Sequence, residues 1–244
     1  MPLTTILFLA LAALLIGLSK GGLGGPVPVS LTAPLLSFVL PVSKAVGIVL
    51  PLLLFADLFA LWVYRGKWDM RYIRLMLPAG VLGVVMGTLL LATLDDETLR
   101  HTLGILTLIA VVYKLANDTI RQLRYQPRNW HGVLAGWASG FGSSLANVGA
   151  PPFTAYMLLQ PRMSPISFIG TTTLFFAIIN ALKLPGFLSS GVLNMSDLAS
   201  VAWMMPIIPV GVYLGRRAIE HINPQVFERL LLILLFILSL VLIF

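Results

Sequence analysis

Two short stretches rich in glycine and proline contain the residues best suited to bind a ligand. The first reads Gly-Gly-Leu-Gly-Gly-Pro over 21–26, and the second reads Asn-Val-Gly-Ala-Pro-Pro over 147–152. In each stretch small residues free the backbone, and a proline can begin a helix, where its missing N–H has no cost. The N–H groups and the positive dipole end at such a helix start favour an anion. The pattern therefore predicts an anion site at each stretch.

Side chains and backbone groups in and beside these stretches are the predicted binding residues. A lysine and an asparagine provide side-chain donors, and the small residues expose backbone N–H groups. The predicted substrate-binding residues are Lys20, Gly24, Gly25, Pro26, Asn147, Gly149, Ala150 and Pro151. A plainer interpretation is that the glycines only allow close helix packing and that Lys20 extends its amine to the membrane interface.

An acidic residue, Asp57, lies inside a long apolar run. An ionisable group in such a run is costly and is therefore a candidate functional residue. It could carry a proton that couples transport to the proton gradient, or it could pair structurally with Lys20, Lys44 or a helix end. The matching position in the second half is the neutral Asn180, so a symmetric proton relay is not required. Asp57 and Asn180 are the candidates for coupling or gating.

The composition places these residues in a membrane. The chain has 244 residues, of which 58% are hydrophobic and 10% are charged, and its mean hydropathy is +0.96. Ordinary soluble domains carry about 25% charged residues, so a water-soluble globular enzyme is excluded. The long apolar runs have the length of membrane-spanning helices. The sequence therefore predicts an all-α polytopic membrane protein in contact with the lipid bilayer.

Several classes of function are disfavoured by residues that the chain lacks or disperses. The chain has no cysteine, which excludes disulfides, thiol catalysis and thiolate metal sites. Its net charge of +7 comes from basic residues dispersed among loops, whereas nucleic-acid binding needs them gathered on one face. The sequence has no nucleotide-binding loop and no His-Glu-x-x-His motif for zinc. We therefore expect no enzyme activity, no cofactor, no metal and no nucleic acid.

The apolar segments give the expected helices. Spanning helices are predicted at 45–63, 72–94, 98–113, 166–182, 198–215 and 226–244. Two broken helix pairs are predicted at 3–40 and 131–160. Their second members, 26–40 and 151–160, reach only about 22 and 15 Å at about 1.5 Å per residue, against an apolar core of about 30 Å.

The two halves of the chain resemble each other in order and spacing, which indicates an internal repeat. The matched positions are Gly22–Pro26 with Asn147–Pro151, Gly47 with Gly170, Asp57 with Asn180, Gly66 with Gly191, Asp69-Met70 with Asn194-Met195, Pro78 with Pro206, Gly83 with Gly211 and Gly87 with Gly215. We predict a first repeat at 1–115, a cytoplasmic linker at 116–130 and a second repeat at 131–244. Each repeat would hold one broken pair and three spanning helices.

Charged loops predict the orientation of these helices. Basic residues gather near 65–74, 114–128 and 216–229, and the positive-inside rule places these loops in the cytoplasm. The loops at 95–97 and 183–197 then face outside, as do both termini of this multi-pass protein of the inner (cytoplasmic) membrane. Equivalent loops of the two halves lie on opposite sides, so the repeats are predicted to be inverted. Inverted repeats with discontinuous helices are typical of secondary transporters.

These motifs resemble the sulfite exporter TauE/SafE family of membrane permeases. The resemblance spans nearly the whole chain and rests on Gly21–Pro26, Ala45-Val46-Gly47, Gly66-Lys67-Trp68-Asp69, Gly149-Ala150-Pro151 and Gly191-Val192-Leu193-Asn194. It implies transport of small sulfur-containing anions such as sulfite, sulfoacetate or other organosulfonates across the inner membrane. The habit of the family, with the small-residue faces at Gly83/Gly87 and Gly211/Gly215, suggests a homodimer. The second stretch has fewer glycines than the first, so the two half-sites need not be chemically equivalent.

The predicted function is a secondary transporter that moves a small sulfur-containing anion by alternating access between two inverted repeats. A proton is the candidate coupling ion. An anion channel, or a carrier of a different small organic anion, is the alternative. Flux that saturates and depends on a proton gradient would favour the carrier over the channel.

Overall fold

The computed structural model describes residues 2–23, 25–120, 128–160, 163–219 and 221–244, and these residues form helices and no β-strand. Six of their helices are long and apolar enough to cross a membrane, and a bent pair adds a seventh candidate. The all-α polytopic prediction is therefore confirmed. The helices are α1 Leu3–Lys20, α2 Val27–Ser30, α3 Thr32–Leu36, α4 Val42–Val63, α5 Met70–Thr93, α6 Asp96–Ile120, α7 Asn129–Ala146, α8 Ala150–Leu158, α9 Pro165–Ser189, α10 Met195–Ala202, α11 Ile207–Ile219 and α12 Pro224–Ile243.

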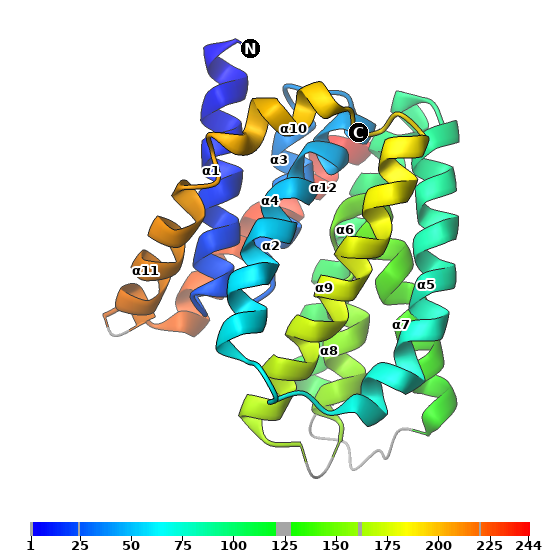
Figure 1. Cartoon of the computed structure of the whole chain (residues 1–244), viewed down its shortest axis with the longest axis vertical. Coiled ribbons are helices and arrows are strands. Elements are labelled where there is room, and N and C mark those ends of the chain that lie inside the picture. The colour runs from blue at the N-terminus through cyan, green and yellow to red at the C-terminus, as the bar shows by residue number, and fades with distance from the viewer. Residues whose placement is uncertain (1, 24, 121–127, 161–162, 220) are drawn as a thin grey trace.

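Two helical hairpins enter the bundle from opposite ends (Figure 1). Helix α1 runs inward from the N-terminal end, and α2 and α3 turn back toward that end. Helix α7 runs inward from the other end, and α8 returns beside it. The N-terminus, the C-terminus and the α5–α6 connection lie toward one end, and the α4–α5 and α11–α12 connections lie toward the other. Because each hairpin returns to the end of the bundle from which it started, the connections lie at the ends predicted from charge. The side of the membrane that each end faces stays a prediction.

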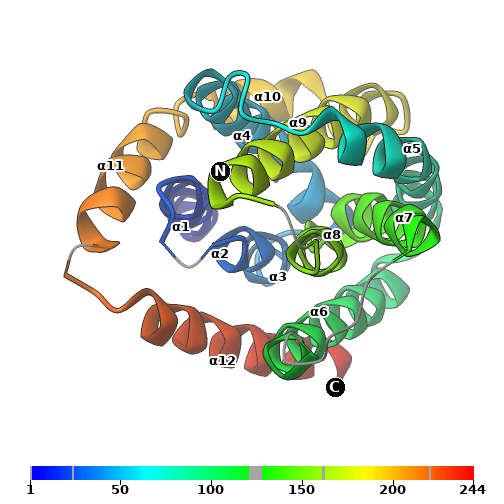
Figure 2. The ribbon, with the colours of Figure 1, turned by 90° about the horizontal axis from the view of Figure 1, so that it is seen from below.

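The helices pack into two bodies, each with its own apolar core. The first body comprises α1, α3, α4, α10 and α11, whose buried residues form one cluster. The second body comprises α5, α8 and α9, which share another cluster, with α7 packed on α5 and α8. Helices α6 and α12 pack together along one side of both bodies (Figure 2). Each body therefore contains helices from both halves of the sequence.

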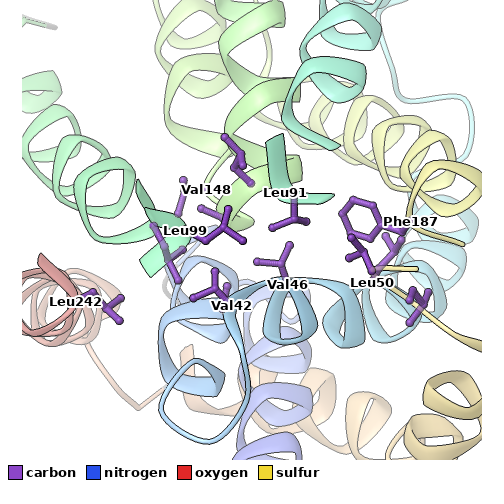
Figure 3. Packing of buried hydrophobic residues seen from close by; sticks show 14 of the residues in the cluster. Val42, Val46, Leu50, Leu91, Leu99, Val148, Phe187 and Leu242 are labelled. Carbon is purple, nitrogen blue, oxygen red and sulfur yellow. The ribbon is translucent and has the colours of Figure 1, made fainter. Parts of the chain in front are cut away.

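A further apolar cluster joins the two bodies near the end of the bundle that carries the α5–α6 connection. We call this the acidic end, because Asp95, Asp96 and Glu97 lie there. It brings Val46 and Leu50 of α4 against Leu91 of α5 and Phe187 of α9, all of them buried (Figure 3). Val148, from the connection between α7 and α8, belongs to the same cluster. Tight apolar packing of this kind leaves no room for water or an ion. The bodies are therefore sealed against each other at this end.

Glycines bring each broken helix against a helix of the other half. A Cβ on Gly17 of α1 would lie 2.7 Å from the Cα of Gly211 in α11. A Cβ on Gly87 of α5 would lie 2.9 Å from the carbonyl oxygen of Phe141 in α7. The small-residue faces predicted at Gly83/Gly87 and Gly211/Gly215 thus pack within the chain, on α7 and α1. These faces are not available to a second copy, so the homodimer stays a prediction without their support.

Matched positions of the two halves share local structure. Gly22 and Asn147 both have positive φ, at 97° and 56°, and Gly66 and Gly191 do so at 71° and 75°. Asp69 and Asn194 are the N-caps of α5 and α10. A Cβ on Gly47 would meet the Val192 carbonyl oxygen at 2.6 Å, and one on Gly170 would meet that of Lys67 at 2.7 Å. These correspondences are what an internal repeat predicts.

Two segments predicted as single helices are broken. The segment 26–40 forms α2 and α3 with Leu31 between them, because Pro34 has no N–H to donate to the Ser30 carbonyl. The segment 198–215 forms α10 and α11, which meet at 52°. Pro206 lies at that break, where a proline removes one donor and disfavours helical geometry at the residue before it.

One helix is longer than the sequence predicts. The expected span 166–182 extends to Ser189 as α9, so Lys183 lies inside the helix and is fully buried. The prediction that 183–197 is an outside loop was therefore wrong for its first seven residues. Pro185 lies inside α9 and does not end the helix.

Candidate functional site

A cavity of about 280 Å³ lies between the two bodies, where the tips of the two hairpins meet. Its walls include most of the predicted binding residues, namely Lys20, Gly25, Pro26, Asn147, Gly149 and Ala150, together with Asn180. Pro151 instead lines a neighbouring cavity of about 210 Å³, and Gly24 lies outside the described residues. Residues more than 120 positions apart in the sequence thus come together at one site.

The cavity extends toward the end of the bundle that carries the basic α4–α5 connection. Its lining includes Tyr64, which follows α4, and Phe168 and Ile169 in the first turns of α9. At the opposite end, the apolar cluster around Leu50 and Phe187 separates it from the acidic end. The site is therefore closed toward the predicted outside and reaches toward the predicted cytoplasm.

The first break, Ser19–Pro26, ends α1 and begins the return to α2. The Leu23 N–H donates to the Leu18 carbonyl at 3.0 Å, and the left-handed Gly22 allows this turn. The Ser19 hydroxyl donates to the Gly25 carbonyl at 2.6 Å. Helix α2 has four residues, too few to sum a substantial dipole. At this break a side chain, not a helix end, supplies the charge.

That charge is Lys20, and it is paired. Its ammonium donates to Asp57 Oδ1 at 2.6 Å, and the Asn180 amide donates to Asp57 Oδ2 at 2.7 Å. The Asp57 side chain is 3% exposed and that of Lys20 is 20% exposed. Of the alternatives for Asp57, the structure shows pairing with Lys20, whereas Lys44 pairs with Asp197 at 2.6 Å. The hydrogen bond from Asn180 to Asp57 thereby joins two matched positions across the two bodies.

The second break, Asn147–Pro152, has a different construction. Asn147 ends α7 in the left-handed conformation, which asparagine tolerates better than most residues. Lys183 of α9 donates to the Ser143 carbonyl, the Ser143 hydroxyl and Asn147 Oδ1 at 3.1, 3.2 and 3.2 Å. In the described part of the chain no carboxylate lies within ion-pair distance of Lys183.

Sequence analysis missed Lys183 as a site residue. A charged residue two positions before a proline has the features of a loop, and the apolar run was ended at Leu182 for that reason. A signal was present, because Lys183 follows Asn180 by three positions. Residues at that spacing lie on the same face of a helix, and Asn180 was already a candidate.

Helix α8 provides fewer backbone donors than expected. Pro151 and Pro152 lie in its first turn and have no N–H. The free donors are therefore those of Gly149 and Ala150, because the first N–H groups of a helix have no acceptor within it. A Cβ on Gly149 would overlap the Ser139 carbonyl oxygen, so only glycine lets this helix start approach α7. Pro151 shapes the helix start without donating a hydrogen bond.

The charged groups at the two breaks leave a net positive charge. Two lysines and one carboxylate, Lys20, Lys183 and Asp57, line the cavity or hydrogen-bond to a residue that does. Backbone donors at Gly149 and Ala150 and the unpaired Nδ2 of Asn147 point to the same kind of ligand. Within the membrane, irregular backbone and charge of this kind occur where they line a cavity. The arrangement can hold a small anion.

Comparison with known proteins identifies the family. The family model described as sulfite exporter TauE/SafE matches residues 9–242. No curated protein and no solved structure matches the chain. The chain therefore belongs to the sulfite exporter TauE/SafE family, a family of membrane transporters for sulfur-containing anions such as sulfite.

Proposed function

We propose that the protein is a secondary transporter that moves a small sulfur-containing anion, such as sulfite, sulfoacetate or another organosulfonate, across the inner membrane. The observation that carries this proposal is the cavity between the bodies, which both breaks line. Basic side chains outnumber acidic ones around this cavity, because Lys20 lines it and Lys183 and Asp57 each hydrogen-bond to a residue that does. A site with this charge favours an anion over a neutral or cationic ligand.

Alternating access is the proposed mechanism, and two observations support it. The first is that the cavity reaches only one end of the bundle, while the Leu50–Phe187 cluster seals the other. The second is the pair of reciprocal contacts at the matched positions, Gly47 with Val192 and Gly170 with Lys67, which supports an inverted repeat that relates the two bodies. Because α1 packs on α11 and α7 packs on α5, each broken helix would move together with the body that contains it. Rocking of one body against the other would then open the opposite end.

Asp57 is the proposed coupling residue. An anion that approaches the Lys20 ammonium competes with Asp57 for the same charge. A carboxylate that loses its cationic partner in a buried site binds a proton more readily. Anion and proton would therefore enter the site together, and Asn180 would hold the protonated Asp57 in place.

Transport by the purified protein in sealed liposomes tests the proposal. Sulfite, sulfoacetate, taurine, sulfate and acetate are each applied with and without a proton gradient. We expect saturable entry of sulfite or a sulfonate, and a loss of about tenfold or more in the Lys20→Ala variant, because a charge-assisted hydrogen bond contributes about 1.5–3 kcal/mol.

Lys44→Ala is the matched control, because Lys44 forms an ion pair of the same length away from the cavity. It should transport at the wild-type rate. Flux that rises linearly with concentration would indicate the channel instead. A folded protein that transports none of the anions would contradict the proposal.

A further inference from the structure

We propose that Lys183 is a positioning residue of the anion site, which holds the Asn147 amide so that its N–H₂ group faces the bound anion. The inference rests on the proposed function and deepens it. It identifies Asn147 as the side chain that touches the anion, and Lys183 as the residue that fixes its orientation from behind.

The position of Lys183 excludes direct contact with the cavity as its main role. Its side chain is fully buried and does not line the cavity, whereas Asn147 and Ser143 do. The three acceptors around its Nζ match the three N–H donors of a protonated lysine. All three acceptors are neutral oxygens. The positive charge therefore acts on the cavity through the groups that Lys183 binds.

The hydrogen bond from Lys183 decides which way the Asn147 amide points. Nζ donates to Oδ1 at 3.2 Å. In the opposite orientation the amide N–H₂ would face the ammonium, donor against donor, and both groups would lose a hydrogen bond. The oxygen is thus fixed toward α9, and Nδ2 points away from Lys183.

Nδ2 of Asn147 has no partner in the described part of the chain, although the residue is only 6% exposed. Four other buried polar atoms share this property, on Thr88, Thr107, Ser139 and Ser144. None of these four residues lines the cavity. A buried donor without an acceptor is unfavourable, and of these five only that of Asn147 belongs to a residue that lines the cavity, so it is the one that a ligand there would satisfy. An acceptor-rich anion beside the free N–H groups of Gly149 and Ala150 meets this requirement.

A purely structural role for Lys183 makes a different prediction. Lys183 binds the Ser143 carbonyl near the C-terminus of α7, where a cation stabilises a helix. If it did only this, its replacement would lower stability and leave the anion affinity of the folded protein unchanged. Affinity and melting temperature must therefore be measured on the same variants.

Variants at Asn147 separate the amide from the backbone. Asn147→Gly keeps the left-handed conformation and removes the amide, so affinity should fall about tenfold. Asn147→Asp places one carboxylate oxygen beside Lys183 and the other at the cavity. It should melt at a higher temperature than wild type and bind anions at least about a hundredfold more weakly, because a buried lysine gains an ion pair while the anion meets a negative charge.

Variants at Lys183 separate orientation from charge. Lys183→Gln retains an N–H donor for Oδ1 and loses the charge, whereas Lys183→Met loses both. Affinity should therefore fall in the order wild type, Lys183→Gln, Lys183→Met. Ser144→Ala is the matched control. It removes a buried hydroxyl that also has no partner among the described residues, on α7 three positions before Asn147. We expect unchanged affinity.

Binding of sulfite and of sulfoacetate is measured by calorimetry on the detergent-solubilised full chain, with melting curves for every variant. Lys183→Met and Asn147→Gly that bind as tightly as wild type would overturn the inference and leave the proposed function standing. Asn147→Asp that retains wild-type affinity would overturn it as well. If Lys183→Met does not fold, Lys183→Gln and Asn147→Gly still decide. A wild-type protein that binds neither anion would overturn the proposed function and this inference together.

Discussion

The two breaks that meet at the cavity occupy matched positions in the sequence but solve the same problem differently. The first break contains an exposed glycine, Gly25, where an added Cβ would meet no described atom within 4 Å. Its lysine is paired with Asp57. The second break is buried, packs Gly149 against α7, and places its lysine on neutral oxygens. The first break thus pairs its lysine with a carboxylate and is open at Gly25, and the second leaves its lysine on neutral acceptors and is tightly packed at Gly149.

This difference assigns the two breaks different tasks. A packed site with fixed donors is preorganised, which raises affinity because little order must be gained on binding. A loosely packed break with an exchangeable ion pair can change its partners as the bodies move. Under the proposed function, the second break would therefore be the anion site proper, and the first would be the part that responds to the anion.

The largest effect is expected from Asp57→Leu, which removes the carboxylate that pairs with Lys20 in the first break. Lys20 and Asn180 would both lose their partner, and the unfolding free energy should fall by about 3 kcal/mol, at the lower limit for a broken buried pair because Lys20 is partly exposed. Chemical unfolding in detergent measures this.

Lys44→Ala, which breaks the more exposed pair with Asp197 and keeps the hydrogen bond from the Asn194 N–H to Asp197, is the control and should lose about 1 kcal/mol or less. Equal losses in the two variants would show that burial does not distinguish these pairs.

A smaller effect is expected from an added methyl group in the second break. In Gly149→Ala the new Cβ overlaps the Ser139 carbonyl and would lie 2.7 Å from the Ser143 Cβ, and such overpacking costs about 1–3 kcal/mol. Gly25→Ala meets no atom and bears only the strain of its φ of 56°, about 1 kcal/mol. Thermal unfolding compares the two. A larger loss for Gly25→Ala would reverse the assignment of the packed break.

The smallest effect is expected when the first break receives the turn residue of the second. Gly22→Asn gives the first break the residue that the second break uses at the matched position, and asparagine accepts the left-handed conformation. We expect a change in unfolding free energy of about 0.5 kcal/mol or less. Gly22→Ala, as the control, should lose about 1 kcal/mol. If Gly22→Asn were as damaging as Gly22→Ala, the two turns would not be equivalent.

Apolar runs, paired breaks and loop charges were enough to predict the fold class and the two broken helix pairs. They also predicted residues such as Lys20 and Asn147, which the structure brings to one cavity. The break at Pro206 could not be predicted, because the matched Pro78 lies inside the unbroken α5. The spacing of Lys183 from Asn180 indicated a shared helix face, but the burial of Lys183 could not be predicted, because it depends on acceptors 36 and 40 residues away. The tertiary context decides whether a proline or a charge ends a helix.

The contact between Gly17 and Gly211 also sets a schedule for biosynthesis. At about 5–20 residues per second, the roughly 190 residues between these glycines take on the order of 10–40 s to be made. Helix α5 meets α7 much earlier, because their glycine contacts are separated by about a third of that length. During the interval the backbone groove of α1 faces lipid or the insertion machinery. Of the described helices, α1 is thus made first and waits longest for the helix it packs on, which exposes it longest to proteolytic quality control.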